Sequence, residues 1–159
     1  MINSVEFMSL RAVKSVRPDS SRAIVSIRDS STRGDLPAFD EFLDVLPLHM
    51  LDVCEEHFML KPGAWVDEPD PDQHLTYCGI PGNFAPATSH AKAVLAFFES
   101  LHACPDAIDV VVHCSAGISR SAAVALWASE RYAVPLLDRA DVGLEEANPR
   151  VLRLLRALG

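Results

Sequence analysis

The alternation of apolar and polar positions predicts two strands in the first third of the chain. Residues 23–27 (AIVSI) form a short apolar run typical of a strand, and the Ser, Gly, Asp and Pro residues that follow indicate a loop. Apolar residues alternate over 45–51 (VLPLHML), which predicts a second strand. Pro47 places this strand at an edge or an irregular position of a sheet, because proline cannot donate to a strand ladder.

The second half of the chain has a clearer periodicity. Residues 87–102 predict a helix, since their apolar positions recur on one helical stripe. Residues 108–114 (IDVVVHC) are β-branched and apolar through their middle, which is typical of a central strand covered on both faces. A helix is predicted over 119–132 (SRSAAVALWASERY), with the hydroxyl of Ser119 as its cap.

Two further helices complete the predicted order of elements. They cover 138–147 (DRADVGLEEA) and 149–158 (PRVLRLLRAL), with Pro149 suited to the first turn of the last helix. The pattern is weak over 54–86, where we expect a long excursion that contains a short strand, LTYCGI, at 75–80. Alternating strands and helices predict an α/β fold with a mostly parallel central sheet flanked by helices on both faces.

Size and charge restrict the classes of function. A length of 159 residues fits one domain, and no run approaches 18 apolar residues, so we expect no membrane-spanning helix. The first 16 residues lack the basic start and apolar block of a secretory signal, and a cytoplasmic location is therefore expected. A net charge of −8 disfavours broad binding to nucleic acid or an anionic membrane.

The sequence contains none of the residue spacings that are typical of metal-binding sites. No Cys-x-x-Cys pair and no His-Glu-x-x-His motif occurs, and DEPDPD (67–72) lacks the glycine and distal glutamate of a calcium loop. We therefore expect no metal and no cofactor, and reduced thiols. The four cysteines are Cys54, Cys78, Cys104 and Cys114.

The segment VVVHCSAGISRSAAV (110–124) carries the candidate chemistry. A loop from a buried strand into a helix directs backbone N–H groups and the positive end of the helix dipole at one point, where an anion would bind. Gly117 lets the backbone curl, and Arg120 on the first helical turn offers paired donors to two oxygens of a phosphate. The same surroundings stabilise a thiolate at Cys114, which could attack phosphorus and form a cysteinyl-phosphate that water then hydrolyses.

These residues resemble the signature of the cysteine-dependent protein tyrosine phosphatases, His-Cys-x-x-Gly-x-x-Arg-Ser/Thr. The complete segment, His-Cys-Ser-Ala-Gly-Ile-Ser-Arg-Ser, is similar to the signature of the dual-specificity branch. Asn-Pro-Arg at 148–150 is similar to a segment of small bacterial members. The likeness covers roughly the last half of the chain. It implies a single phosphatase-like domain over residues 1–159.

The resemblance also implies roles for individual residues. Cys114 would be the nucleophile and Arg120 the phosphate clamp, His113 would position the loop and favour the thiolate, and Ser121 would assist departure of the sulfur. The substrate-binding cradle would consist of Ser115, Ala116, Gly117, Ile118, Ser119 and Arg120. The substrate would be a phosphorylated protein, carrying phosphotyrosine and also phosphoserine or phosphothreonine, or a small phosphate ester.

A general acid is also needed, and here the sequence departs from the family. Where the family has an aspartate, about thirty residues before the nucleophile, this chain has Gly82-Asn83-Phe84. Asp52 at the end of a predicted strand is our preferred acid. Its rivals lie on the acidic segment that follows, which a lid movement could bring over the site. They are Asp67, Asp70 and Asp72.

Other classes of function use a similar loop. A phosphate-binding pseudophosphatase would keep the cradle without turnover. Enzymes acting on phosphoinositides or RNA 5′-phosphates would benefit from lysines in the loop, whereas Ser115, Ala116 and Ile118 are neutral. A sulfurtransferase would close a shorter loop on its cysteine than the six-residue step from Cys114 to Arg120.

Overall fold

A parallel β-sheet forms the centre of the molecule. The computed structural model describes residues 1–29, 38–65, 84–138 and 144–159. Five strands pair in the order β3-β2-β4-β1-β5, and each described pair is parallel. The strands are β1 (Ile2–Ser9), β2 (Arg22–Arg28), β3 (Asp44–His49), β4 (Ile108–Cys114) and β5 (Leu136–Asp138).

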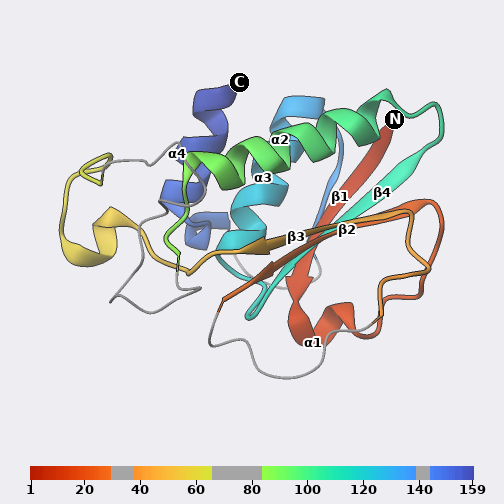
Figure 1. The fold of residues 1–159 in the computed structure, drawn as a ribbon, viewed down its shortest axis with the longest axis horizontal. Helices are drawn as coiled ribbons and strands as arrows, with labels where there is room; N and C mark the ends of the chain where they lie inside the picture. The colour runs from red at the N-terminus through yellow and green to blue at the C-terminus, as the bar shows by residue number, and fades with distance from the viewer. Residues whose placement is uncertain (30–37, 66–83, 139–143) are drawn as a thin grey trace.

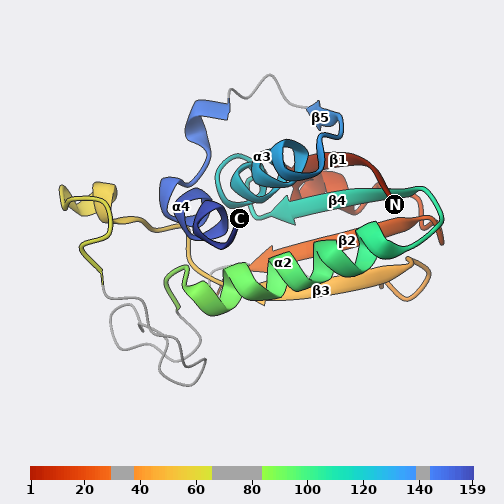
Figure 2. The same cartoon turned by 90° about the horizontal axis from the view of Figure 1, so that it is seen from above.

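Helices lie on both sides of this sheet. Figure 1 shows α2, α3 and α4 together on one side and α1 on the other, and Figure 2 shows α2 and α3 lying over the sheet. The α/β architecture expected from the sequence is therefore confirmed, although α1 is only one turn long. The helices are α1 (Leu10–Val13), α2 (Thr88–Ala103), α3 (Arg120–Tyr132) and α4 (Pro149–Leu158), with short 3-10 turns η1 (Glu55–Phe58) and η4 (Leu144–Glu146).

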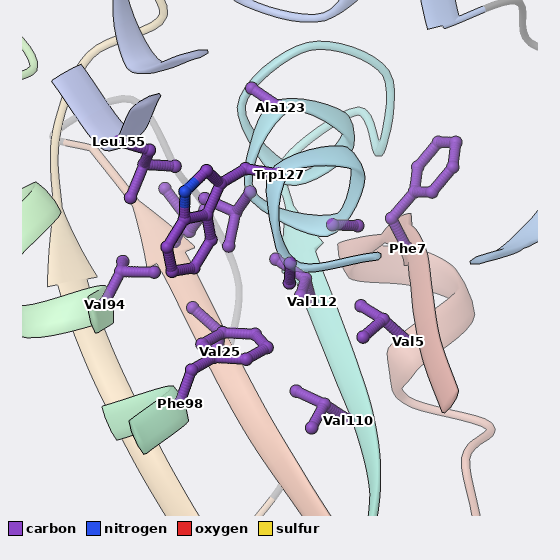
Figure 3. Close-up of a cluster of buried hydrophobic side chains, with 14 of the residues drawn as sticks. Val5, Phe7, Val25, Val94, Phe98, Val110, Val112, Ala123, Trp127 and Leu155 are labelled. Atoms are coloured by element: carbon purple, nitrogen blue, oxygen red, sulfur yellow. The ribbon is translucent and has the colours of Figure 1, made fainter. Parts of the chain in front are cut away.

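The main core fills the space between the sheet and the three longer helices. Alternate residues of β4, Val110 and Val112, face these helices, as does Val25 of β2 (Figure 3). Phe98 of α2 meets Trp127 of α3 edge to face, with ring centroids 5.7 Å apart. This contact joins α2 to α3 above the sheet.

A smaller core covers the opposite face of the sheet. Val111 of β4 and Ile24 of β2 point to this face and pack with Val13 of α1 and with Phe42. Because β4 is buried on both faces, it needs apolar residues at successive positions. This explains the uninterrupted valines.

Most predicted elements are confirmed. The strand at 23–27 lies within β2, the strand at 45–51 corresponds to β3, and β3 is at the sheet edge as Pro47 indicates. The helix predicted at 87–102 is α2, and 108–114 is the central strand β4.

Two elements near the chain ends differ from the sequence-based expectation. No strand was predicted in the first 16 residues, whereas β1 occupies Ile2–Ser9 between β4 and β5. The helix predicted over 138–147 is wrong: Asp138 ends β5 and Leu144–Glu146 form a 3-10 turn. Leu136 and Leu137 are too short a run to show strand periodicity. The predicted strand at 75–80 lies outside the described residues.

None of the helices in the described ranges has both the length and the hydropathy that crossing a bilayer requires.

The segment after β3 is joined to α4 by buried charged side chains. Glu55 of η1 is fully buried and accepts from Arg150 Nη1 at 2.5 Å and from Arg153 Nη2 at 2.6 Å. Arg150 also donates through Nε to the carbonyl of Pro86 at 2.7 Å. These bonds fix the chain beyond Asp52 relative to α4.

Replacing Arg150 tests this connection. In Arg150→Met the buried carboxylate of Glu55 loses one of its two cations, and we expect the free energy of unfolding to fall by about 3 kcal/mol. Arg156→Met on the same helix removes an exposed pair with Glu130 and should cost less than about 1 kcal/mol. Urea unfolding of both variants measures the difference, and equal losses would contradict the assignment.

Candidate functional site

The carboxyl ends of the parallel strands gather the candidate residues at one edge of the sheet. Cys114 ends β4, Asp29 follows β2, and Asp52 comes three residues after the end of β3. Because the strands are parallel, these ends lie at the same edge, which is where open α/β sheets bind ligands. The loop from Cys114 to Arg120 crosses this edge and enters α3.

Gly117 is the residue that lets this loop lie against β1. Its φ is +75°, and a Cβ atom built there would lie 2.2 Å from the backbone nitrogen of Ser9. No side chain fits in that space. The end of β1 is also joined to the loop by a hydrogen bond from Leu10 N to the carbonyl of Ser115 at 3.3 Å. The curl expected from the sequence is therefore present, with β1 as the surface that shapes it.

Cys114 lies at the base of the loop. Its Sγ accepts from the backbone N–H of Gly117 at 3.2 Å and lies 3.2 Å from Oγ of Ser121. The residue is 1% exposed and borders the main core. The sulfur nevertheless contacts two polar groups, and its N–H donor is of the kind that stabilises a thiolate.

Arg120 is held from one side of its guanidinium. Its Nη1 donates to Asp29 Oδ2 at 2.6 Å and to the carbonyl of Met50 at 2.7 Å. Nη2 lies 3.5 Å from Oγ of Ser115. Nε is buried and has no hydrogen-bond partner among the described residues. The Nε and Nη2 edge is thus the side of the guanidinium with donor capacity for an anion.

Asp52 lies beside this edge of Arg120. Its Oδ2 is 3.9 Å from Arg120 Nε, while its Oδ1 accepts from Ser119 Oγ at 2.6 Å and from Asn148 Nδ2 at 2.8 Å. The predicted capping role of Ser119 is wrong, because its hydroxyl makes no cap hydrogen bond to α3. The hydroxyl binds the carboxylate of Asp52 instead.

His113 is buried at the end of β4, directly before Cys114. Its Nε2 is 2.8 Å from Oγ of Ser26, and the side chain has no exposed surface. Burial lowers the pKa of His113 to about 4, so the ring is neutral at pH 7. The neutral ring joins the end of β4 to Ser26 of β2 and carries no positive charge.

An open cleft of about 380 Å³ adjoins the loop. Predicted cradle residues Ala116, Ile118 and Ser119 form one wall, and Asp52 is also part of its lining. The remaining lining residues are His57, Glu145, Glu146, Ala147 and Pro149. Asp52, which the sequence analysis prefers as general acid, and the outer surface of the loop therefore line the same cleft.

Two residues of this arrangement were not predicted as site residues. Asp52 directly follows the strand predicted at 45–51, whereas Asp29 comes two residues after the strand predicted at 23–27. In the structure β2 extends to Arg28, so Asp29 also lies at a strand end. Asn148 carried no chemical signal by itself, because an asparagine before proline is typical of a helix cap. Here it caps α4 and also contacts Asp52.

The alternative acids Asp67, Asp70 and Asp72 lie outside the described residues, as does Cys78. Within the part of the chain that the structure describes, no group of three His, Cys, Asp or Glu side chains could hold a metal ion.

Comparison with family models, curated proteins and solved structures gave no match. Functional assignment therefore depends on the residues and their geometry.

Gly117→Ala tests the contact between the loop and β1. The positive φ and the clash with the Ser9 backbone should together reduce the free energy of unfolding by about 3 kcal/mol. Gly63→Ala is the matched control, since Gly63 also has a positive φ of +77° but a Cβ there would have no atom within 4 Å. We expect that control to lose about 1 kcal/mol. Chemical denaturation measures both, and similar losses would refute the close contact.

The buried neutral state of His113 predicts a pH-dependent stability. Below its ordinary pKa of 6.5 the unfolded chain takes up a proton that the folded chain does not bind until pH about 4. The contribution of the neutral His113 to stability is therefore complete well above pH 6.5 and is lost as the pH falls toward 4. Between pH 6.5 and about 4.5 the wild type should lose about 2 kcal/mol more than His113→Gln. Urea titrations at both pH values test this, and parallel losses would contradict it.

Proposed function

We propose that this protein hydrolyses phosphate monoesters through a cysteinyl-phosphate intermediate, as a cysteine-dependent protein tyrosine or dual-specificity phosphatase. The observation that carries the proposal is the buried Nε and Nη2 edge of Arg120, beside the loop that holds Cys114. A buried guanidinium edge with unused donors is suited to two oxygens of a phosphoryl group. On the other side of the same guanidinium, Nη1 forms an ion pair with Asp29.

In the first step the Cys114 sulfur attacks phosphorus. An S–P bond forms and the ester P–O bond breaks, while the leaving oxygen takes a proton from Asp52. Negative charge from a phosphoryl group bound at Arg120 would lie near Oδ2 of Asp52, 3.9 Å from Nε.

In the second step water attacks phosphorus and the S–P bond breaks. Asp52, now a carboxylate, accepts the proton of the water, and inorganic phosphate leaves. The sulfur regains its negative charge, supported by the N–H of Gly117 and the hydroxyl of Ser121, each 3.2 Å away. The cycle requires no metal and no redox cofactor.

The cleft beside the loop supports a phosphorylated amino-acid side chain as substrate. Among the described residues, its lining contains Asp52, Glu145 and Glu146 and no lysine or arginine. Polyanionic esters such as phosphoinositides or RNA ends would place further negative charge against these carboxylates. A phosphotyrosine, phosphoserine or phosphothreonine on a protein carries its charge at the phosphoryl group alone.

Hydrolysis of p-nitrophenyl phosphate and phenyl phosphate in a chelating buffer tests the proposal. Wild type should turn over both esters, and Cys114→Ser should be inactive because the hydroxyl is a much weaker nucleophile. Asp52→Asn should lose about 100-fold in kcat on phenyl phosphate, whose phenolate needs a proton, and far less on the nitrophenyl ester.

Matched controls lie away from the site. Cys104→Ser alters the half-exposed thiol after α2, and Asp106→Asn alters an exposed carboxylate before β4. Both should keep wild-type rates. Tight vanadate binding without turnover by the wild type would instead identify a phosphate-binding module, and activity retained in Cys114→Ser would exclude the cysteinyl-phosphate route.

A further inference from the structure

Asn148 joins three segments that surround the proposed acid. Its backbone N–H donates to the carbonyl of Ser119 in the loop at 3.1 Å. Its side chain accepts from the backbone of α4 and donates to Asp52 Oδ1 at 2.8 Å, with a longer contact to the carbonyl of Val53 at 3.4 Å. The residue is 1% exposed. These contacts connect the start of α4, the phosphate loop and the chain after β3.

The contacts determine which way the amide of Asn148 faces. Its Oδ1 accepts from Arg150 N and Val151 N, both at 3.1 Å, and two backbone donors require an oxygen on that side. Its Nδ2 faces a carboxylate and a carbonyl, which require a donor. A reversed amide would place like groups together on both sides, so the donation to Asp52 follows from the network.

The two hydrogen bonds to Asp52 distinguish its oxygens. Asn148 Nδ2 and Ser119 Oγ both donate to Oδ1, and Oδ2 is the oxygen that approaches Arg120 Nε. A carboxyl oxygen that accepts two hydrogen bonds has little room for a proton, so a proton donated by Asp52 would be carried by Oδ2. Asn148 thus directs the proton-carrying oxygen toward the phosphate clamp.

We propose that Asn148 is a positioning residue for general acid catalysis, which orients Asp52 by holding Oδ1 so that Oδ2 faces the leaving group. This inference rests on the proposed phosphatase function. It assigns to Asn148 a role in the rate of proton transfer in addition to its capping of α4. A capping role alone would affect the stability of α4 and would not depend on the ester being cleaved.

Asn148→Ser separates the two roles. Serine is an equally good helix cap, so α4 keeps its N-terminal hydrogen bonds, but the short hydroxyl does not extend to Asp52. We expect kcat on phenyl phosphate to fall by about 10- to 100-fold and kcat on p-nitrophenyl phosphate by less than about 3-fold. Asn148→Asp is the second variant: it also caps the helix but presents an acceptor to Asp52, and should show the same selective loss.

A double-mutant cycle with Asp52→Asn supplies the decisive readout. If Asn148 acts through Asp52, then Asn148→Ser should change kcat on phenyl phosphate by less than about 2-fold once Asp52 is replaced. Arg156→Ala is the control on the same helix, since it removes an exposed pair with Glu130 far from Asp52. Circular dichroism of each variant checks that α4 is retained.

The outcomes separate this inference from the function on which it rests. A wild type that cleaves neither ester overturns the phosphatase function, and the role of Asn148 with it. A wild type that cleaves both, combined with equal losses on the two esters or additive effects in the cycle, overturns the positioning role and leaves the phosphatase function standing.

Discussion

The buried ion pair between Arg120 and Asp29 is the interaction on which the site depends. Their side chains are 4% and 6% exposed, and Nη1 of Arg120 lies 2.6 Å from Oδ2 of Asp29. Such a pair adds little net stability, because removing both charges from water offsets most of their attraction. Its consequence is geometric: the end of β2 and the carbonyl of Met50 after β3 fix one side of the guanidinium at the start of α3. The opposite side is thereby directed toward the loop and Asp52.

Much of the fold follows from local sequence pattern. The valines of β4 have neighbours on both faces, and Pro47 lies in the edge strand, because burial and hydrogen bonding restrict which residues a strand accepts at each place. The curl of the loop after β4 was also predictable, since the sequence places a glycine between Cys114 and Arg120 where a strand meets a helix. Gly117 has the positive φ that this reasoning expects.

Other features depend on partners distant in sequence. β1 carries Glu6 within an apolar run, and its place between β4 and β5 arises from pairings across about a hundred residues. The short strand β5 exists because β1 offers it an edge. Serine is a common helix-capping residue, yet the hydroxyl of Ser119 binds Asp52 because the tertiary fold brings that carboxylate within 2.6 Å. A local sequence pattern cannot show that a distant carboxylate competes with the backbone of α3 for this hydroxyl.

The packing of Gly117 on the end of β1 couples the loop from Cys114 to Arg120 to the assembly of the whole sheet. The loop takes its shape from a strand that lies more than a hundred positions earlier in the chain, so this geometry exists once the first strand has been inserted between its two neighbours. A ligand that selects this geometry therefore acts on the global folding equilibrium, and its binding energy adds to the stability of every element that supports the loop.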